Sequence, residues 1–168
     1  MAVREIVYLP DPVLRRKARK IDRVDAETQE LIADMIETMR AAPGVGLAAP
    51  QIGISRRLIV VEFGDEEDET IPQKLYVVIN PEIVKASNEM ETGIEACLSV
   101  PGLAGIVERS EVITVKGQNR HGQPLRIKAD GWLARIFQHE IDHLDGIVYT
   151  DRAERVWQPE ENEAFADV

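Results

Sequence analysis

The residues best suited to do chemistry lie together near the end of the chain, in the run His139-Glu140-Ile141-Asp142-His143. On a helix, residues four apart differ by only about 40° around the axis, so both imidazoles point the same way. Two imidazoles aimed at one point suit a transition metal ion, and the glutamate beside them can act as general base on its water. A buried helix with two hydrogen-bonded histidines is the alternative, disfavoured because these are two of only three histidines in the chain.

A catalytic metal site usually has three protein ligands and an open position for water, so a third ligand is needed. No histidine follows His143, which leaves a carboxylate or the chain's one cysteine, Cys97. Metal binding deprotonates a thiol and makes it a good ligand. A lone cysteine is also commonly a small buried hydrophobe, and its residue type does not decide between the two.

A stretch of small residues lies further upstream, Gly44-Val45-Gly46-Leu47-Ala48-Ala49-Pro50-Gln51. Small residues let a backbone or a ligand approach closely. The amide of Gln51 could donate a hydrogen bond to an oxyanion. A tightly packed loop without chemistry is the alternative. A phosphate-cradling loop is excluded, because the lysine of that motif is absent.

Together and in this order, three segments resemble the peptide deformylase family. Its motifs are a Gly-x-Gly-x-Ala-Ala-x-Gln loop, a Glu-Gly-Cys-Leu-Ser segment and a His-Glu-x-x-His helix. Here they match residues 44–51, 95–99 and 139–143, and the resemblance extends from about Leu9 to Asp151. One departure is Ala96, which stands where the family has its second glycine. We expect a negative φ at Ala96, with its methyl group lining the cleft beside Cys97.

The resemblance implies an α+β fold of antiparallel sheets packed around a central metal-binding helix. It also implies hydrolytic removal of the N-formyl group from the initiator methionine of nascent peptides, releasing formate. One divalent ion per chain would be bound by Cys97, His139 and His143, with ferrous iron expected and zinc, nickel or cobalt able to substitute. Glu140 would carry the proton.

Further roles follow from the same resemblance. The Gln51 amide and the backbone N–H of Leu98 would stabilise the oxyanion. Gly46 would offer its backbone to the peptide. We expect the apolar pocket for the methionine side chain to be lined by Val45, Trp132 and Ile136.

Two other functions fit parts of the sequence. A zinc endopeptidase could be read from the helix motif alone, but it would need a downstream third ligand and would leave Cys97 and Gln51 without roles. A non-catalytic module could use the metal structurally, but such a site has no need of Glu140 beside it. Deformylation remains the favoured hypothesis.

Length and charge limit the remaining options. The 168 residues suit one catalytic domain, expected over residues 1–151, with a short acidic tail over 152–168. Thirty acids against twenty bases give a net charge of −10, which disfavours direct binding to nucleic acid. No run is long and apolar enough for a signal peptide or a membrane span. We expect a cytoplasmic protein that acts on N-formylmethionyl nascent peptides and associates transiently with the ribosome.

Elements that must position these residues can be placed from hydrophobic periodicity. Helices are predicted over 25–40 and 131–144, and a helical start at Asp11-Pro12. Residues 119–122 form the turn of a predicted hairpin, and helices at the two ends with strands between them indicate an α+β fold. The predicted strands are 58–61, 75–79, 83–84, 112–115, 125–127 and 147–149.

Three charged or polar stretches receive no chemistry. The acidic residues 62–69 are predicted to be a solvated loop, and the acidic tail is predicted to fray. The basic run 15–20 is predicted to pair with neighbouring acids. His121 is predicted to be exposed in its turn.

Overall fold

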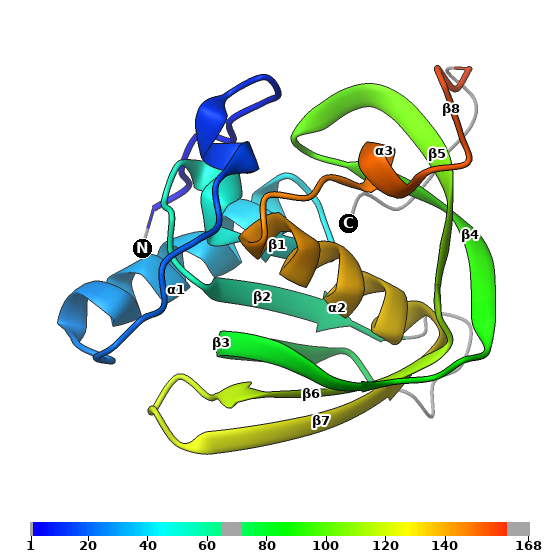
Figure 1. Ribbon diagram of the computed structural model, residues 1–168. Helices are drawn as coiled ribbons and strands as arrows, with labels where there is room; N and C mark the ends of the chain where they lie inside the picture. Colours follow the sequence, from blue (N-terminus) through cyan, green and yellow to red (C-terminus); the bar gives the residue numbers. More distant parts are fainter. Residues whose placement is uncertain (1, 65–71, 161–168) are drawn as a thin grey trace.

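The computed structural model describes residues 2–64 and 72–160. The helix that contains His139 and His143 packs against the larger of its two sheets (Figure 1). Five strands form this sheet in the order β1-β2-β3-β6-β7, and every neighbouring pair is antiparallel. The strands are β1 (Gly46–Ala48), β2 (Leu58–Phe63), β3 (Lys74–Ala86), β6 (Val112–Gln118) and β7 (Pro124–Asp130). The α+β class with antiparallel sheets is therefore confirmed.

The sheet is covered by a helix on each face. Helix α1 (Ala26–Ala41) packs on one face and helix α2 (Gly131–Leu144) on the other. Successive side chains of a strand point to opposite faces. Leu58 and Val60 of β2 therefore join the cluster around α1, while the intervening Ile59 joins the cluster around α2. Burial on both faces explains why this strand is a continuous apolar run.

Both long helices lie where periodicity predicted them. Asp25 caps α1 by accepting a hydrogen bond from the backbone N–H of Thr28, which satisfies one of the free donors at the helix start. The predicted helical start at Pro12 is a short 3-10 helix, Pro12–Arg15, and a second one, Ala49–Ile52, follows β1. No helix in the described part of the chain is long and apolar enough to cross a membrane.

A second sheet of three strands was missed by the sequence analysis. Its order is β4-β5-β8, with β4 (Met90–Cys97), β5 (Val100–Ser110) and β8 (Arg155–Trp157). Half of the residues of β4 are exposed, and the glycines in both long strands weaken their apolar alternation. The long β4–β5 hairpin curls up beside α2 (Figure 1).

The predicted strand at 147–149 is wrong. Helix α3 (Tyr149–Arg152) begins there, because the Asp151 carboxylate accepts a hydrogen bond from the backbone N–H of Val148. Tyr149 turns inward and packs closely on β5, where a Cβ at Gly105 would lie 3.0 Å from its ring. The tail also differs from expectation in its first part, because β8 pairs with β5 instead of fraying.

The charged stretches behave differently from one another. Arg15 pairs with Asp151 as predicted, but the other four bases of the run 15–20 form no ion pair with any described residue, so that prediction is wrong for them. In the acidic stretch, Glu62 lies in β2 and pairs with Arg40, while positions 65–69 lie outside the described residues. His121 is exposed, as predicted.

Strand β3 continues across the gap between the two short strands predicted at 75–79 and 83–84. Its register shifts between Ile79 and Glu82, and Asn80 has a φ of 52°, the one positive φ outside glycine among the described residues. The Asn80 Oδ1 accepts from the Ile21 backbone N–H at 2.8 Å, and its Nδ2 donates to the Ile21 carbonyl at 2.8 Å. The asparagine therefore pairs with Ile21 as another strand would.

Replacing Asn80 should separate the contribution of its side-chain hydrogen bonds to stability from the contribution of its positive φ. Asn80→Gly loses the two side-chain hydrogen bonds to Ile21 and the one that Nδ2 donates to the Gln118 Oε1 at 3.3 Å, but it accepts the positive φ. Asn80→Ala loses the same bonds and also carries strain of about 1 kcal/mol. Both variants should have a lower free energy of unfolding in urea than the wild type, and that of the alanine variant should be the lower of the two. Glycine costs roughly 0.5–1 kcal/mol more conformational entropy on folding than alanine, so a glycine variant that is less stable than the alanine variant by this amount would show that φ carries no strain.

Candidate active site

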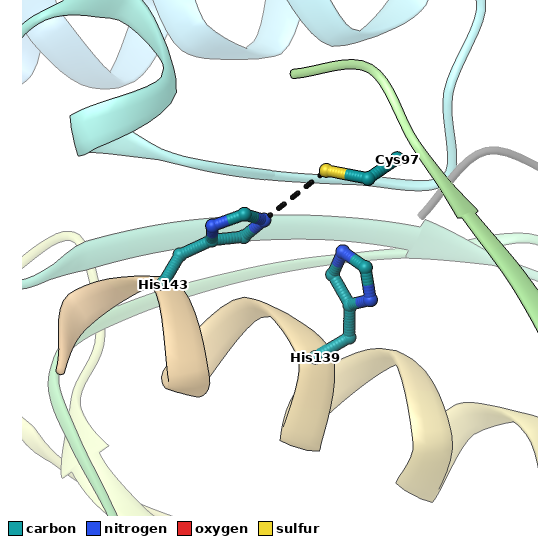
Figure 2. Close-up of side chains that lie close together, drawn as sticks. All are labelled: Cys97, His139 and His143. Carbon is teal, nitrogen blue, oxygen red and sulfur yellow. Dashed lines mark hydrogen bonds between the residues drawn. The ribbon is translucent and has the colours of Figure 1, made fainter. Parts of the chain in front are cut away.

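The three predicted metal ligands come together in the structure. Cys97 ends β4, while His139 and His143 lie on consecutive turns of α2 and turn toward the sulfur (Figure 2). One donor atom from each residue lies within 4.8 Å of the other two. The Cys97 Sγ is 3.3 Å from the His143 Nε2, and all three side chains are almost completely buried.

The hydrogen bonding of His139 leaves one nitrogen free to bind a metal ion. Its Nδ1 lies 2.8 Å from the Glu95 Oε1, so an Nδ1–H donates to this carboxylate and the lone pair lies on Nε2. That Nε2 is buried and has no hydrogen-bond partner among the described residues. A buried acceptor without a partner costs free energy, and a metal ion would remove that cost. The donor set fits a divalent transition metal.

Glu95 itself was quoted in a motif but given no role by the sequence analysis. Its carboxylate is fully buried and also accepts from Arg109, whose Nε lies 3.0 Å from Oε2 and whose Nη2 lies 2.9 Å from Oε1. Burial raises the pKa of Glu95, but the bonds from Arg109 and His139 outweigh it and hold the pKa well below its ordinary value. The available signal in the sequence was a carboxylate two residues before Cys97.

The second histidine is held neutral by its surroundings. Burial lowers the pKa of His143 well below its ordinary value, and the neighbouring His139 lowers it further. A neutral imidazole is the form that binds a metal ion.

Glu140 lies buried on α2 between the two histidines in sequence. Both of its carboxylate oxygens lack a hydrogen-bond partner among the described residues. Burial raises the pKa of Glu140 well above its ordinary value, and the charge of Glu95 adds to the rise. Strand β1 passes close to this carboxylate, because a Cβ at Gly46 would lie 2.6 Å from the Glu140 Oε2. Gly46 therefore leaves room for the glutamate.

Gln51 reaches the same centre from the second 3-10 helix. Its Oε1 accepts from the backbone N–H of Ala48 at 2.9 Å, which orients the amide. Its Nε2 donates to the Ser99 Oγ at 3.2 Å and lies 3.6 Å from the Cys97 Sγ. The amide is fully buried beside the sulfur.

The remaining predicted residues divide between two apolar clusters. Val45, Trp132 and Ile136 pack in the cluster around α2, with Ile136 fully buried and the other two partly exposed. Leu98 packs instead with the cluster around α1. Ala96 is buried and has no positive φ, so the expectation of an unstrained alanine is confirmed.

A cysteine and two histidines with converging donors lie next to a buried glutamate that has no hydrogen-bond partner in the described part of the chain, and these groups define the class as a metal-binding hydrolase. Comparisons with known proteins agree. The family model described as polypeptide deformylase matches residues 3–158. A peptide deformylase from Natranaerobius thermophilus is 50% identical over 162 residues, which cover 96% of this chain and 99% of that protein.

Solved structures show the same fold. A peptide deformylase from Thermotoga maritima matches with a TM-score of 0.85 and 41% identity, covering 92% of this chain and 100% of that one. The class I type b peptide deformylase from Acinetobacter baumannii, with Met-Ala-Ser bound, has a TM-score of 0.83 and 36% identity, covering 90% and 98%. The chain belongs to the polypeptide deformylase family. Its reaction is removal of the N-formyl group from nascent peptides.

The raised pKa of Glu140 predicts how the stability of the metal-free protein depends on pH. Above the ordinary pKa of 4.5, the folded state keeps a proton that the unfolded state has released, so this residue lowers stability as pH rises. Glu140→Gln removes that dependence. The melting temperature of the variant minus that of the wild type should therefore increase from pH 5 to pH 7.5. Since His143 is present in both proteins, a difference that stays constant with pH would contradict the raised pKa.

Ala96→Gly should cost stability, because Ala96 lies in β4 without a positive φ that glycine could relieve. Glycine within a strand is less stable than alanine by roughly 0.5–1 kcal/mol. Urea unfolding of the metal-free protein should show a loss of this size. A gain in stability would mean that the alanine is strained.

Proposed function

We propose that Cys97, His139 and His143 bind one divalent metal ion per chain, and that this centre hydrolyses the formyl amide of N-formylmethionyl nascent peptides. The observation that carries the proposal is the buried His139 Nε2, which has no partner in the described part of the chain and points at the other two donors. Such an ion, when bound, lowers the pKa of a water molecule towards about 7 and polarises a carbonyl group.

Ferrous iron is our proposal for the resident ion, with zinc, nickel and cobalt as substitutes. One thiolate and two imidazoles can bind each of these metals, so availability as well as affinity decides which is present. Metal analysis of protein purified without oxygen tests the iron proposal directly.

Glu140 is proposed to accept the proton of the attacking water and to deliver it to the leaving amine. Its buried carboxylate has no competing hydrogen-bond donor among the described residues, so it is free to take up a proton. A raised pKa suits a group that must hold that proton until the amine leaves.

The developing negative charge on the formyl oxygen needs hydrogen-bond donors. We assign this role to the amide of Gln51 and to the backbone N–H of Leu98. Gln51 is supported by the 3.6 Å between its Nε2 and the Cys97 Sγ. Leu98 is supported by chain connectivity, because its N–H belongs to the peptide bond that follows Cys97.

The methionine side chain is proposed to occupy a pocket lined by Val45, Trp132 and Ile136, with the peptide backbone bound along Gly46. The three apolar residues pack in one cluster on the side of the sheet that carries α2. The Acinetobacter baumannii relative, solved with Met-Ala-Ser bound, supports a peptide that begins with methionine.

We further propose that the enzyme acts in the cytoplasm, associates transiently with the ribosome and does not bind nucleic acid directly. Nascent peptides are its substrates, which supports the first two points. The net charge of −10 supports the third.

The activity can be tested with two peptides. Formyl-Met-Ala-Ser should release formate, whereas an internally cleavable peptide with both ends blocked should remain intact. His139→Ala should abolish both metal binding and formate release, and His121→Ala, which changes an exposed histidine, should leave both unchanged. Cleavage of the blocked peptide would favour an endopeptidase and would contradict the proposal.

The role of Glu140 is tested separately from metal binding. Glu140→Ala should retain one metal ion per chain and lose roughly 10²- to 10⁴-fold in turnover, the usual scale for a positioned acid–base group. Turnover close to that of the wild type, or loss of the metal, would assign this residue another role.

A further inference from the structure

We propose that Arg135 is a positioning residue for the metal centre: it holds strand β4, which carries Cys97 and Glu95, against helix α2, which carries both histidines. This proposal rests on the metal ligands assigned above. Neither the motifs nor the proposed chemistry gives this arginine a role.

Arg135 joins three polypeptide segments through one guanidinium group. It lies one turn before His139 on α2, and its side chain is only 4% exposed. Its Nη1 donates to the Glu95 Oε2 at 2.6 Å and to the Val107 carbonyl of β5 at 2.9 Å. Its Nη2 donates to the Glu91 carbonyl of β4 at 2.7 Å. The helix is therefore tied to both strands of the hairpin.

The space around the guanidinium is closed on two sides. A Cβ at Gly93 of β4 would lie 2.8 Å from the Arg135 Cζ, and the Trp132 ring centre lies 5.7 Å from the same atom. The planar fork of arginine can serve several acceptors at once, whereas a lysine ammonium has no fixed fork. Gly93 therefore gives Arg135 the room that its contacts require.

The consequence for the metal centre follows from the spacing on β4. Glu95 and Cys97 are two residues apart on this strand, and Glu95 uses its other oxygen to orient His139. A shift of β4 relative to α2 would move the sulfur and the acceptor of His139 together. Arg135 opposes that shift at the start of the ligand-bearing part of α2.

Arg109 acts at the other end of the same stretch. Its Nη1 donates to the Asp142 Oδ2 at 2.6 Å, next to His143. The two arginines thus restrain α2 at two points, one turn before His139 and at Asp142 next to His143. The Arg109 guanidinium donates to Glu95 and Asp142 and has no described hydrogen bond to the Glu91 carbonyl, so it does not replace the bond that Arg135 donates there.

Four variants test the proposal. Arg135→Met removes the contacts, Arg135→Lys keeps the charge without the fork, and Gly93→Ala displaces the guanidinium without changing any charge. Arg152→Met is the control, because Arg152 donates to Asp142 at 2.7 Å and has no contact with Glu95. Cobalt affinity is measured by competition with a chelator, and the visible spectrum of the cobalt protein reports thiolate and imidazole geometry.

We expect Arg135→Met to weaken cobalt binding by roughly 10- to 100-fold and to change the spectrum. Arg135→Lys and Gly93→Ala should show the same change to a smaller extent, and Arg152→Met should match the wild type. If Arg135→Met does not fold, the lysine and Gly93→Ala variants decide the question. Unchanged cobalt affinity and spectrum in the folded variants, even with a lower melting temperature, would overturn the positioning role. A wild-type protein without a thiolate–cobalt band would instead overturn the proposed ligand set.

Discussion

The buried carboxylate of Glu95 is the interaction on which the metal centre depends. It accepts hydrogen bonds from Arg109, Arg135 and His139, with two donors on each oxygen. An ionised carboxylate is stable in the protein interior only when hydrogen-bond donors and counter-charges replace its lost hydration. The loss of any one of these donors would leave part of the charge uncompensated, so each donor is held in place. One residue thereby links the helix, the hairpin and the orientation of a metal-binding imidazole.

This arrangement explains how the second sheet is held beside α2 although half of the residues of β4 are exposed. Arg109 and Arg135 hold the β4–β5 hairpin to α2. Tyr149 of α3 packs against β5, and its ring is stacked on the His139 ring with 5.9 Å between the ring centroids. Polar contacts that are fully satisfied replace part of the apolar packing that usually joins a sheet to a helix. The hairpin in turn delivers Cys97 to the histidines.

Glu140, beside the same two histidines on α2, presents the opposite case. Glu95 is surrounded by donors and stays ionised, whereas Glu140 has none among the described residues and is driven toward its protonated form by burial. Two buried carboxylates whose charges interact therefore have pKa values shifted in opposite directions. Such a separation is typical of sites in which one carboxylate orients a ligand and the other transfers a proton. Gly46 leaves room for the buried Glu140 carboxylate, since any side chain at this position would occupy the same space.

Local sequence determined a large part of this protein. The two helices, the hairpin at residues 119–122 and the strand at 58–61 follow from periodicity and turn residues, which depend on near neighbours. The helical spacing of His139 and His143 likewise determined that their donors converge. Resemblance to a family added Cys97, a residue whose type alone left ligand and hydrophobe equally open.

The tertiary structure decided what depends on distant partners. Strands β4 and β8 have little periodicity of their own. The residue types at 147–149 favour a strand, because they reveal neither the Asp151 cap nor the packing of Tyr149. The roles of Glu95 and Arg135 were equally hidden, since they are 40 residues apart in the chain and only 2.6 Å apart in space. A charged residue in a sequence does not show whether it will be solvated or buried. That outcome depends on which counter-charges the fold brings beside it.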